Sequence, residues 1–279
     1  MVCTATLARA EEEPGLAADK SHYSLFNPTP TGQMREFQTD RPDQTEGPYT
    51  VDAGHLQVEM DLVTYFYDRR NPEHVTREAL VVADPTFRLG LLNDVEAQLI
   101  TTSFVYQETR FRDTGASDYR SGSGDTILRA KWNLWGNDGG DTAFALLPYL
   151  KLPTNTRRLG NRYVEGGLIL PLTVKLPLDF ELDLMTEFDV LRNGDDRGYH
   201  LESANSLALH RDLIKDRLNA YIEFYSAVSR DPHAGPVETV DTGLLLLVAE
   251  NVQLDCGVNI GLTRRAINYN PFVGLTVRF

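Results

Sequence analysis

Carboxylates recur at almost every second position of the stretch LDFELDLMTEFDV, residues 178–190. In an extended backbone, Glu181, Asp183, Glu187 and Asp189 share one face, and leucine and phenylalanine occupy the other. A helix would scatter these acids around its circumference, so the pattern favours a β-strand with one apolar and one wet face. A ladder of carboxylates around water favours cations. The period alone leaves open which face points inward.

Other segments with the same alternation carry charges on their polar faces. If those faces surround a wet lumen, the predicted lining residues are Glu59, Asp61, Arg88, Arg129, Lys131, Lys151, Glu181, Asp183, Glu187, Asp189, Glu223, Asp241 and Asp255. Bases and acids then lie on different sides, which predicts a transverse field with net cation preference. The alternative is that these charges pair into a network that fills the lumen and conducts nothing.

His200, Glu202, Ser206 and His210 share one strand face and raise the possibility of a Ser/His hydrolase. Successive residues on one face lie about 7 Å apart, and no nucleophile and base in mutual reach can be named. The histidine spacing matches no known metal site. We therefore expect neither catalysis nor a metal nor a cofactor.

Bulk properties exclude several classes of protein. The chain has 279 residues, a net charge of −13 and a pI near 4.9, which argues against a nucleic-acid partner. Cys3 and Cys256 cannot build a disulfide framework or a multi-cysteine metal site. The most apolar run, GLLLLVA at 243–249, is too short for a transmembrane helix. A β-barrel stays possible, because its strands alternate.

About twelve segments have the length of a tilted membrane-spanning strand. Their spans are 55–67, 75–90, 94–107, 124–135, 142–152, 163–175, 178–190, 199–210, 217–229, 237–248, 251–262 and 271–279. The connections alternate between long and short, including a long one around FRDTGASDYRSGS. This parity is typical of an outer-membrane barrel with tight periplasmic turns and larger external loops. A soluble sandwich gives no reason for it.

Two features complicate this interpretation. Pro85, Pro148 and Pro171 fall inside expected strands, where each removes a hydrogen-bond donor. The stretch LIKDRLNAYIEFY, residues 213–225, has a spacing of apolar residues that suits a helix about as well as a strand. Its neighbours favour a strand.

Three features favour apolar residues outside and charges inside. Aromatic residues gather near the expected strand ends, as interfacial girdles do. A closed barrel hides every strand edge. The last segment, PFVGLTVRF, resembles the C-terminal assembly signal of outer-membrane proteins, with Gly274, Val277 and Phe279 in place and Phe272 where a polar residue is usual. The resemblance implies the barrel-assembly machinery as a partner.

The N-terminal part differs from the rest. Residues 1–10 resemble the end of a truncated signal peptide, with Ala8-Arg9-Ala10 as a cleavage-like site. Residues 11–53 are polar and aperiodic, which predicts an irregular segment. It either obstructs the lumen as a plug or is a mobile leader. Residues 54–279 form the expected barrel.

The runs TDRPDQTEGPYTVDAGHLQVE (39–59), GSGDTILRAKWNLWGNDGG and ALLPYLKLPTNT resemble the outer-membrane proteins grouped as the "MetA pathway of phenol degradation", often described as transporters. The resemblance covers residue 39 to the end. It implies a barrel in the outer membrane, in contact with its lipid, and uptake of aromatic or hydrophobic compounds.

The fold expected from the sequence is therefore all-β: a transmembrane antiparallel up-and-down barrel of about twelve strands. The expected function is passive diffusion of small-molecule solutes, such as phenols, through a narrow charged lumen. The alternative is a non-conducting structural or adhesive barrel. A soluble β-sandwich is a more distant third possibility.

Overall fold

The computed structural model describes residues 19–195, 197–231 and 234–279, so the expected signal peptide at 1–10 lies outside the described part. The regular secondary structure of the described residues consists of one short 3-10 turn, η1 (Thr31–Gln33), and strands. No helix among them is long and apolar enough to span a membrane. The strands are β1 (Leu56–Asp68), β2 (Val75–Gly90), β3 (Val95–Thr101), β4 (Phe104–Phe111), β5 (Ser117–Gly122), β6 (Thr126–Trp135), β7 (Thr142–Leu152), β8 (Glu165–Leu176), β9 (Phe180–Arg192), β10 (Tyr199–Ile214), β11 (Leu218–Ser229), β12 (Val237–Ala249), β13 (Val252–Gly261) and β14 (Tyr269–Arg278).

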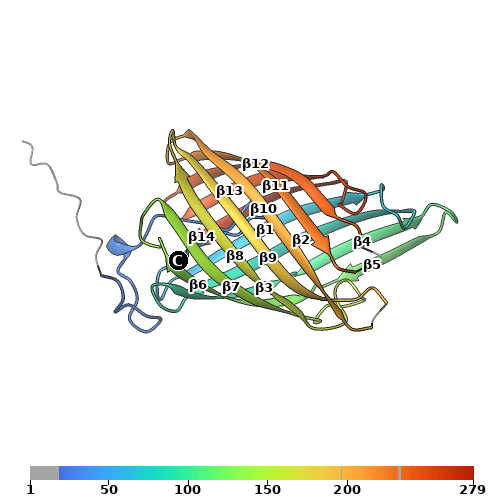
Figure 1. Ribbon diagram of the computed structural model, residues 1–279, viewed down its shortest axis with the longest axis horizontal. Helices are drawn as coiled ribbons and strands as arrows, with labels where there is room; N and C mark the ends of the chain where they lie inside the picture. The colour runs from blue at the N-terminus through green and yellow to red at the C-terminus, as the bar shows by residue number, and fades with distance from the viewer. Residues whose placement is uncertain (1–18, 196, 232–233) are drawn as a thin grey trace, which may run out of the picture.

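The strands close into one antiparallel barrel (Figure 1). From β6 to β14, each strand pairs with the next one in sequence, and β1 closes the ring by pairing with both β14 and β2. β3 and β4 both pair with β2, while β6 pairs with β3 and β5 with β4. β3 with β4 and β5 with β6 are therefore two interrupted barrel strands, and the barrel has twelve strands, as predicted.

The two interruptions lie side by side and are held together by backbone hydrogen bonds. The amide of Gly124 donates to the carbonyl of Thr102 at 3.0 Å, and the amide of Ser103 donates to that of Ala83 at 3.1 Å. Ala83 has a φ of 55°, a left-handed conformation that bends β2 at the same level. A side chain at Gly124 would meet the Cβ of Thr102 at 2.7 Å, so only glycine fits this close approach.

The structure differs from the sequence-based strand assignment in two places. The expected strand 94–107 is interrupted at 102–103, between β3 and β4. The stretch around FRDTGASDYRSGS is not one long loop, because Ser117–Gly122 forms β5 against β4, with Glu108 opposite Tyr119. This strand is hard to recognise in the sequence because β5 projects beyond the apolar outer surface of the barrel, so that both of its faces are polar. The ambiguous stretch 213–225 is extended, with a turn at 215–217, and Pro85, Pro148 and Pro171 all lie within strands, as predicted.

The burial of side chains is the inverse of that in a soluble protein, with charged residues buried and apolar residues exposed. Phe224 is 44% exposed while its neighbour Glu223 is 1% exposed, and Phe188 and Asp189 show the same contrast. Large apolar side chains thus cover the outer surface, and ionisable groups point into the barrel. Such an exterior requires lipid around it. This confirms the predicted transmembrane fold.

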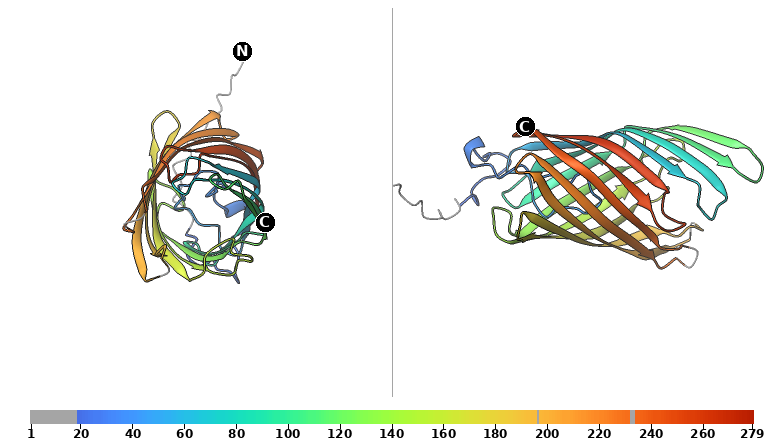
Figure 2. Two further views of the ribbon diagram at one scale, coloured as in Figure 1. Left: turned by 90° about the vertical axis from the view of Figure 1, so that its right-hand side faces the viewer. Right: turned by 90° about the horizontal axis from the view of Figure 1, so that it is seen from above.

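The two ends of the barrel differ. The connections at 91–94, 136–141, 177–179, 215–217 and 250–251 lie at the end where the barrel chain begins and finishes, and most of them are tight. The opposite end carries the connections 69–74, 112–116, 153–164, 193–198, 230–236 and 262–268. By the rule for outer-membrane barrels, the first end is periplasmic. Figure 2 shows residues near 20–50 entering the ring of strands from this end.

The inverted exterior predicts how a charge on the outer face affects stability. Arginine at Phe224, near the middle of β11, should lower the free energy of unfolding by roughly 2–4 kcal/mol. Arginine at Val228, outward on the same strand but near its end, should lower it by about 0–1 kcal/mol. Urea unfolding of protein folded into lipid vesicles measures both. Equal costs would contradict a bilayer centred on the barrel.

Candidate functional site

The candidate site is the barrel lumen together with residues 35–53, which we call the lumenal segment. This segment runs along the inside of the wall and has no regular secondary structure. Irregular backbone is tolerated at membrane depth where protein surrounds it. The predicted lining residues Glu59, Asp61, Arg88, Arg129, Lys131, Glu223, Asp241 and Asp255 all contact the segment.

The remaining predicted lining residues lie elsewhere on the inner wall. Lys151 is 3.9 Å from Asp125, near the external end. Asp189 accepts a hydrogen bond of 2.6 Å from the Tyr149 hydroxyl, and Glu187 is near the same tyrosine. Glu181 and Asp183 line a cavity at the periplasmic end.

A charge cluster on β1, β2, β3 and β6 holds the middle of the lumenal segment. Lys131 Nζ donates to both carboxylate oxygens of Asp40, at 2.6 and 2.7 Å. Arg88 Nη1 lies 3.1 Å from Asp40 and 2.6 Å from Glu59, while its Nε donates to Glu96 at 2.9 Å. The four wall side chains are almost completely buried, and the Asp40 side chain is 9% exposed. Buried charges of this kind persist only when they are paired.

The backbone of the lumenal segment completes the same cluster. The carbonyls of Tyr49 and Gly47 accept hydrogen bonds of 2.7 Å from Arg88 and Lys131. The amide of Val51 donates to Glu96 at 2.6 Å. Main-chain groups that have no ladder partner are thus satisfied by wall charges.

Arg41 connects the segment to the strands that close the barrel. Its Nη2 lies 2.7 Å from Asp255 on β13 and 2.8 Å from Asp61 on β1. Gly274 on β14 makes room for this guanidinium, since a Cβ there would collide with Arg41 Nη2. The C-terminal pattern also places Gly274 in an assembly signal, and that role stays a prediction. Its place under Arg41 gives it a second reason to be glycine.

Residues 43–45 contact the opposite wall, on β9 to β12, and Glu46 returns to β6. The backbone amide of Gln44 donates to Glu223 at 2.9 Å, and its side-chain Nε2 donates to Asp241 at 2.6 Å. Thr45 forms a hydrogen bond with Ser206 at 2.6 Å, and Glu46 pairs with Arg129. Ser206 is therefore engaged by threonine, and His210 lies against Asp43 and Asp183 instead. The structure does not assemble the Ser/His pair that the sequence raised as a possibility.

Part of the inner wall is apolar. Leu147 on β7, Ile169 on β8 and Met185 on β9 form a buried cluster, with Tyr149 and Tyr225 packed against it. The Met185 sulfur faces the Glu46 amide at 3.5 Å. This cluster is what we call the apolar side of the lumen; it lies beside the carboxylates of β9, while β1 to β6 carry the densest pairing of bases and acids.

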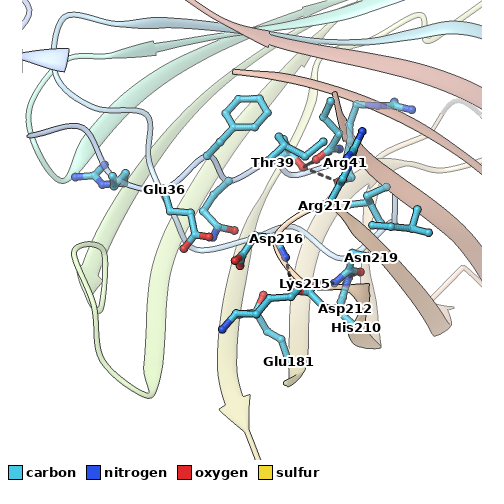
Figure 3. A pocket seen from close by; sticks show the side chains of 18 of the residues that line it. Glu36, Thr39, Arg41, Glu181, His210, Asp212, Lys215, Asp216, Arg217 and Asn219 are labelled. Carbon is cyan, nitrogen blue, oxygen red and sulfur yellow. Dashed lines mark hydrogen bonds between the residues drawn. The ribbon is translucent and has the colours of Figure 1, made fainter. Parts of the chain in front are cut away.

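The periplasmic end contains a cavity of about 740 Å³. The lumenal segment, the turns at 177–179 and 215–217 and the end of β14 surround it (Figure 3). Glu36, Glu181, Asp183 and Asp212 are among its acidic lining residues, with Lys175 and Arg278 among the basic ones.

A ring of polar contacts anchors the segment at the periplasmic rim. Arg35 donates to Asn93 at 2.8 Å and to Asp138 at 3.2 Å, in two adjacent turns. Burial acts to raise the pKa of the Asp138 carboxyl, but hydrogen bonds from Asn93 and Lys20 outweigh it and hold that pKa below its usual value. Asp138 therefore stays ionised as a partner for Arg35.

Sequence reasoning missed the counter-charges Asp40, Asp43 and Glu46, as well as Glu96 in the wall. Glu96 and Gln98 share the inward face of β3, so Glu96 could have been identified from the period-two pattern of that strand. The aperiodic segment offers no such signal. The element DRPDQTEG, residues 40–47, could be expected to fold against the lumen or the periplasmic rim, but no partners could be assigned to its charges.

Comparisons with known proteins bear on the family and the fold. The family described as "Putative MetA-pathway of phenol degradation" matches residues 39–279. Among solved structures, the COG4313 outer membrane channel from Pseudomonas putida F1 superposes with a TM-score of 0.62 at 13% identity, covering 87% of this chain and 100% of that one. At this identity the likeness shows the fold.

Weaker likenesses include the NanC porin, with a TM-score of 0.49, 8% identity and coverage of 80% and 98%. The β domain of the Bordetella autotransporter BrkA gives 0.48, 13% identity and coverage of 81% and 99%. A comparison with curated proteins gave no match. Through the match over residues 39–279, and with a twelve-stranded barrel whose exterior is built for lipid, the chain belongs to the "Putative MetA-pathway of phenol degradation" family of outer-membrane barrels.

Proposed function

We propose that the protein is an outer-membrane channel for passive uptake of small molecules, with the lumenal segment as a plug that gates it. The observation that carries this proposal is the set of ion pairs between residues 40–46 and the wall. A segment held by polar contacts, rather than by a dry apolar interface, can exchange those contacts for water when it moves. The solute and the barrel-assembly machinery are the partners that this function implies.

Aromatic solutes suit the apolar side of the lumen. Leu147, Ile169 and Met185 are at most 4% exposed in the closed arrangement, and movement of the segment would open an apolar surface there, with the rings of Tyr149 and Tyr225 beside it. Charged groups line the other side, so a small molecule with a ring and a polar end can contact both. The family description, which refers to phenol degradation, points in the same direction.

The second candidate function is a non-conducting structural or adhesive barrel. The dense pairing of Asp40 with Lys131 and Arg88 favours it, because these groups fill the central lumen. Conductance distinguishes the two functions.

Replacing Asp40 with asparagine should open the channel. The change leaves Lys131 without its carboxylate partner and weakens the contact of the segment by about 3–5 kcal/mol, the usual cost of breaking a buried ion pair. Single-channel recording in planar bilayers should show a larger open fraction than in the native protein. Asp113→Asn, the same change in an external loop, should leave the open fraction unaltered. An unchanged open fraction in Asp40→Asn, with heat-modifiable gel mobility intact, would favour the non-conducting barrel.

The open channel should prefer cations. The acidic residues around the periplasmic cavity, together with Glu187 and Asp189 on the wall, attract positive ions. In a salt gradient, the reversal potential of Asp40→Asn should have the sign of cation selectivity. A reversal potential of the opposite sign would refute this preference.

Entry of aromatic solutes into liposomes tests the role of the apolar side. Phenol itself crosses lipid unaided, so tyramine and arabinose are better probes. Leu147→Asn should reduce the tyramine rate by several fold relative to arabinose, since it removes apolar contact. Leu150→Asn, on the same strand but facing lipid, is the matched control. If both variants keep the native ratio of rates, the apolar side does not select solutes.

A further inference from the structure

A histidine and two aspartates meet where the lumenal segment touches β9 and β10. His210 Nε2 lies 3.1 Å from Asp43 Oδ2 and 3.3 Å from Asp183 Oδ2. One oxygen or nitrogen atom from each residue lies within 4.8 Å of the others. Asp43 comes from the lumenal segment, so the cluster is complete only when that segment is in place.

Hydrogen bonds around the imidazole determine which nitrogen carries a proton. Asn219 Nδ2 donates to Asp212 Oδ1 at 3.1 Å, which leaves Asn219 Oδ1 to accept from His210 Nδ1 at 3.4 Å. The second Asp212 oxygen accepts from the Asp216 amide at 3.2 Å. With hydrogen on Nδ1, the Nε2 lone pair of a neutral ring faces two carboxylates. A positive charge is needed between these three atoms.

The spacing suits a metal ion. Ligand atoms bound tetrahedrally at about 2.0–2.2 Å from Zn²⁺ lie about 3.3–3.6 Å from one another. The two distances from His210 Nε2 are close to that edge length. Two carboxylates with a neutral imidazole carry two negative charges, which a divalent ion balances. A mixed imidazole and carboxylate set is one that Zn²⁺ accepts.

The ligands are also supported from behind. Thr173 donates to Asp183 Oδ1 and leaves Oδ2 directed at the histidine. His210 has the Asn219–Asp212 chain on its other nitrogen, and its ring stacks on Tyr221 with centroids 5.5 Å apart. A histidine whose second nitrogen is held by a carbonyl oxygen is the usual arrangement in metal sites.

Solvent reaches the cluster through the periplasmic cavity. Asp43, Asp183, His210 and Asn219 all line it, and Figure 3 shows His210 and Asn219 beside Glu181. A fourth position on the ion is therefore open to water or to the Glu181 carboxylate.

We propose that Asp43, Asp183 and His210 bind one divalent transition-metal ion, with Zn²⁺ as the best fit, and that the ion fastens the lumenal segment to the wall. Binding stands on the geometry alone. The consequence for gating rests on the proposed function.

Calorimetric titration of Zn²⁺ into tag-free, chelator-treated full-length protein in detergent at pH 7 tests the site. One ion per chain should bind. Asn219→Ala should weaken binding by about 10–100-fold, the usual effect of losing an outer partner. His210→Gln and Asp43→Asn should weaken it by at least as much. His200→Gln, the same change on β10, should bind as the native protein does.

Asp43→Asn alters only the lumenal segment, so its barrel should fold, which heat-modifiable gel mobility checks. Absence of stoichiometric binding, or equal loss of binding in His200→Gln and His210→Gln, would overturn the site and leave a protonated histidine between two acids.

For gating, Zn²⁺ should lower the open fraction of the native protein several fold and leave the open fraction of Asp43→Asn unchanged. Binding without this effect overturns the fastening role. If Asp40→Asn also never conducts, the proposed function fails while the metal site stands.

Discussion

The structure depends on the need to neutralise charge inside a closed barrel. The inward faces of β1, β2, β3 and β6 carry Arg88, Lys131 and two glutamates, almost completely buried. Isolated buried charges are costly by several kcal/mol each, and they are retained when partners surround them. Asp40 supplies the partner for the two bases, and Arg41 supplies one for Asp61 and Asp255. The lumenal segment and the wall therefore complete each other electrostatically.

This complementarity has an order along the chain. Asp40 faces bases, Arg41 faces acids, Asp43 faces a histidine and Glu46 faces Arg129. A shift of the segment by one residue would set Arg41 against Lys131 and Arg88, where like charges repel. The register of an irregular segment is thus fixed by alternation of sign, as the register of a strand is fixed by its apolar face.

The barrel was predictable because two signals agreed. Period-two alternation gave the strands, and the parity of the connections gave the membrane topology, so residues such as Phe224 and Glu223 were assigned to the correct sides. The sequence did not reveal the interruptions at 102–103 and 123–125, because polar residues continue across them. The positions of Asp40 and Asp43 were also beyond prediction, since long-range ion pairs leave no local period. His210 was singled out as a possible hydrolase residue, but its neighbours in the structure are Asp43 and Asp183 and include no serine nucleophile.

The distribution of contacts bears on how the segment could move. Its attachments lie at the rim, at Arg35, and then on two opposite walls, through Asp40 on one and through residues 43–45 on the other. Because these attachments are spread over several wall strands, loss of one leaves the others in place, and full withdrawal requires several to be exchanged for water together. Asp43 borders the periplasmic cavity, yet its side chain is 6% exposed and that of Asp40 is 9% exposed, so the two attachments are buried to a similar extent. The closed state therefore depends on the charge pairs at both places, because neither can be exchanged for water without the segment moving.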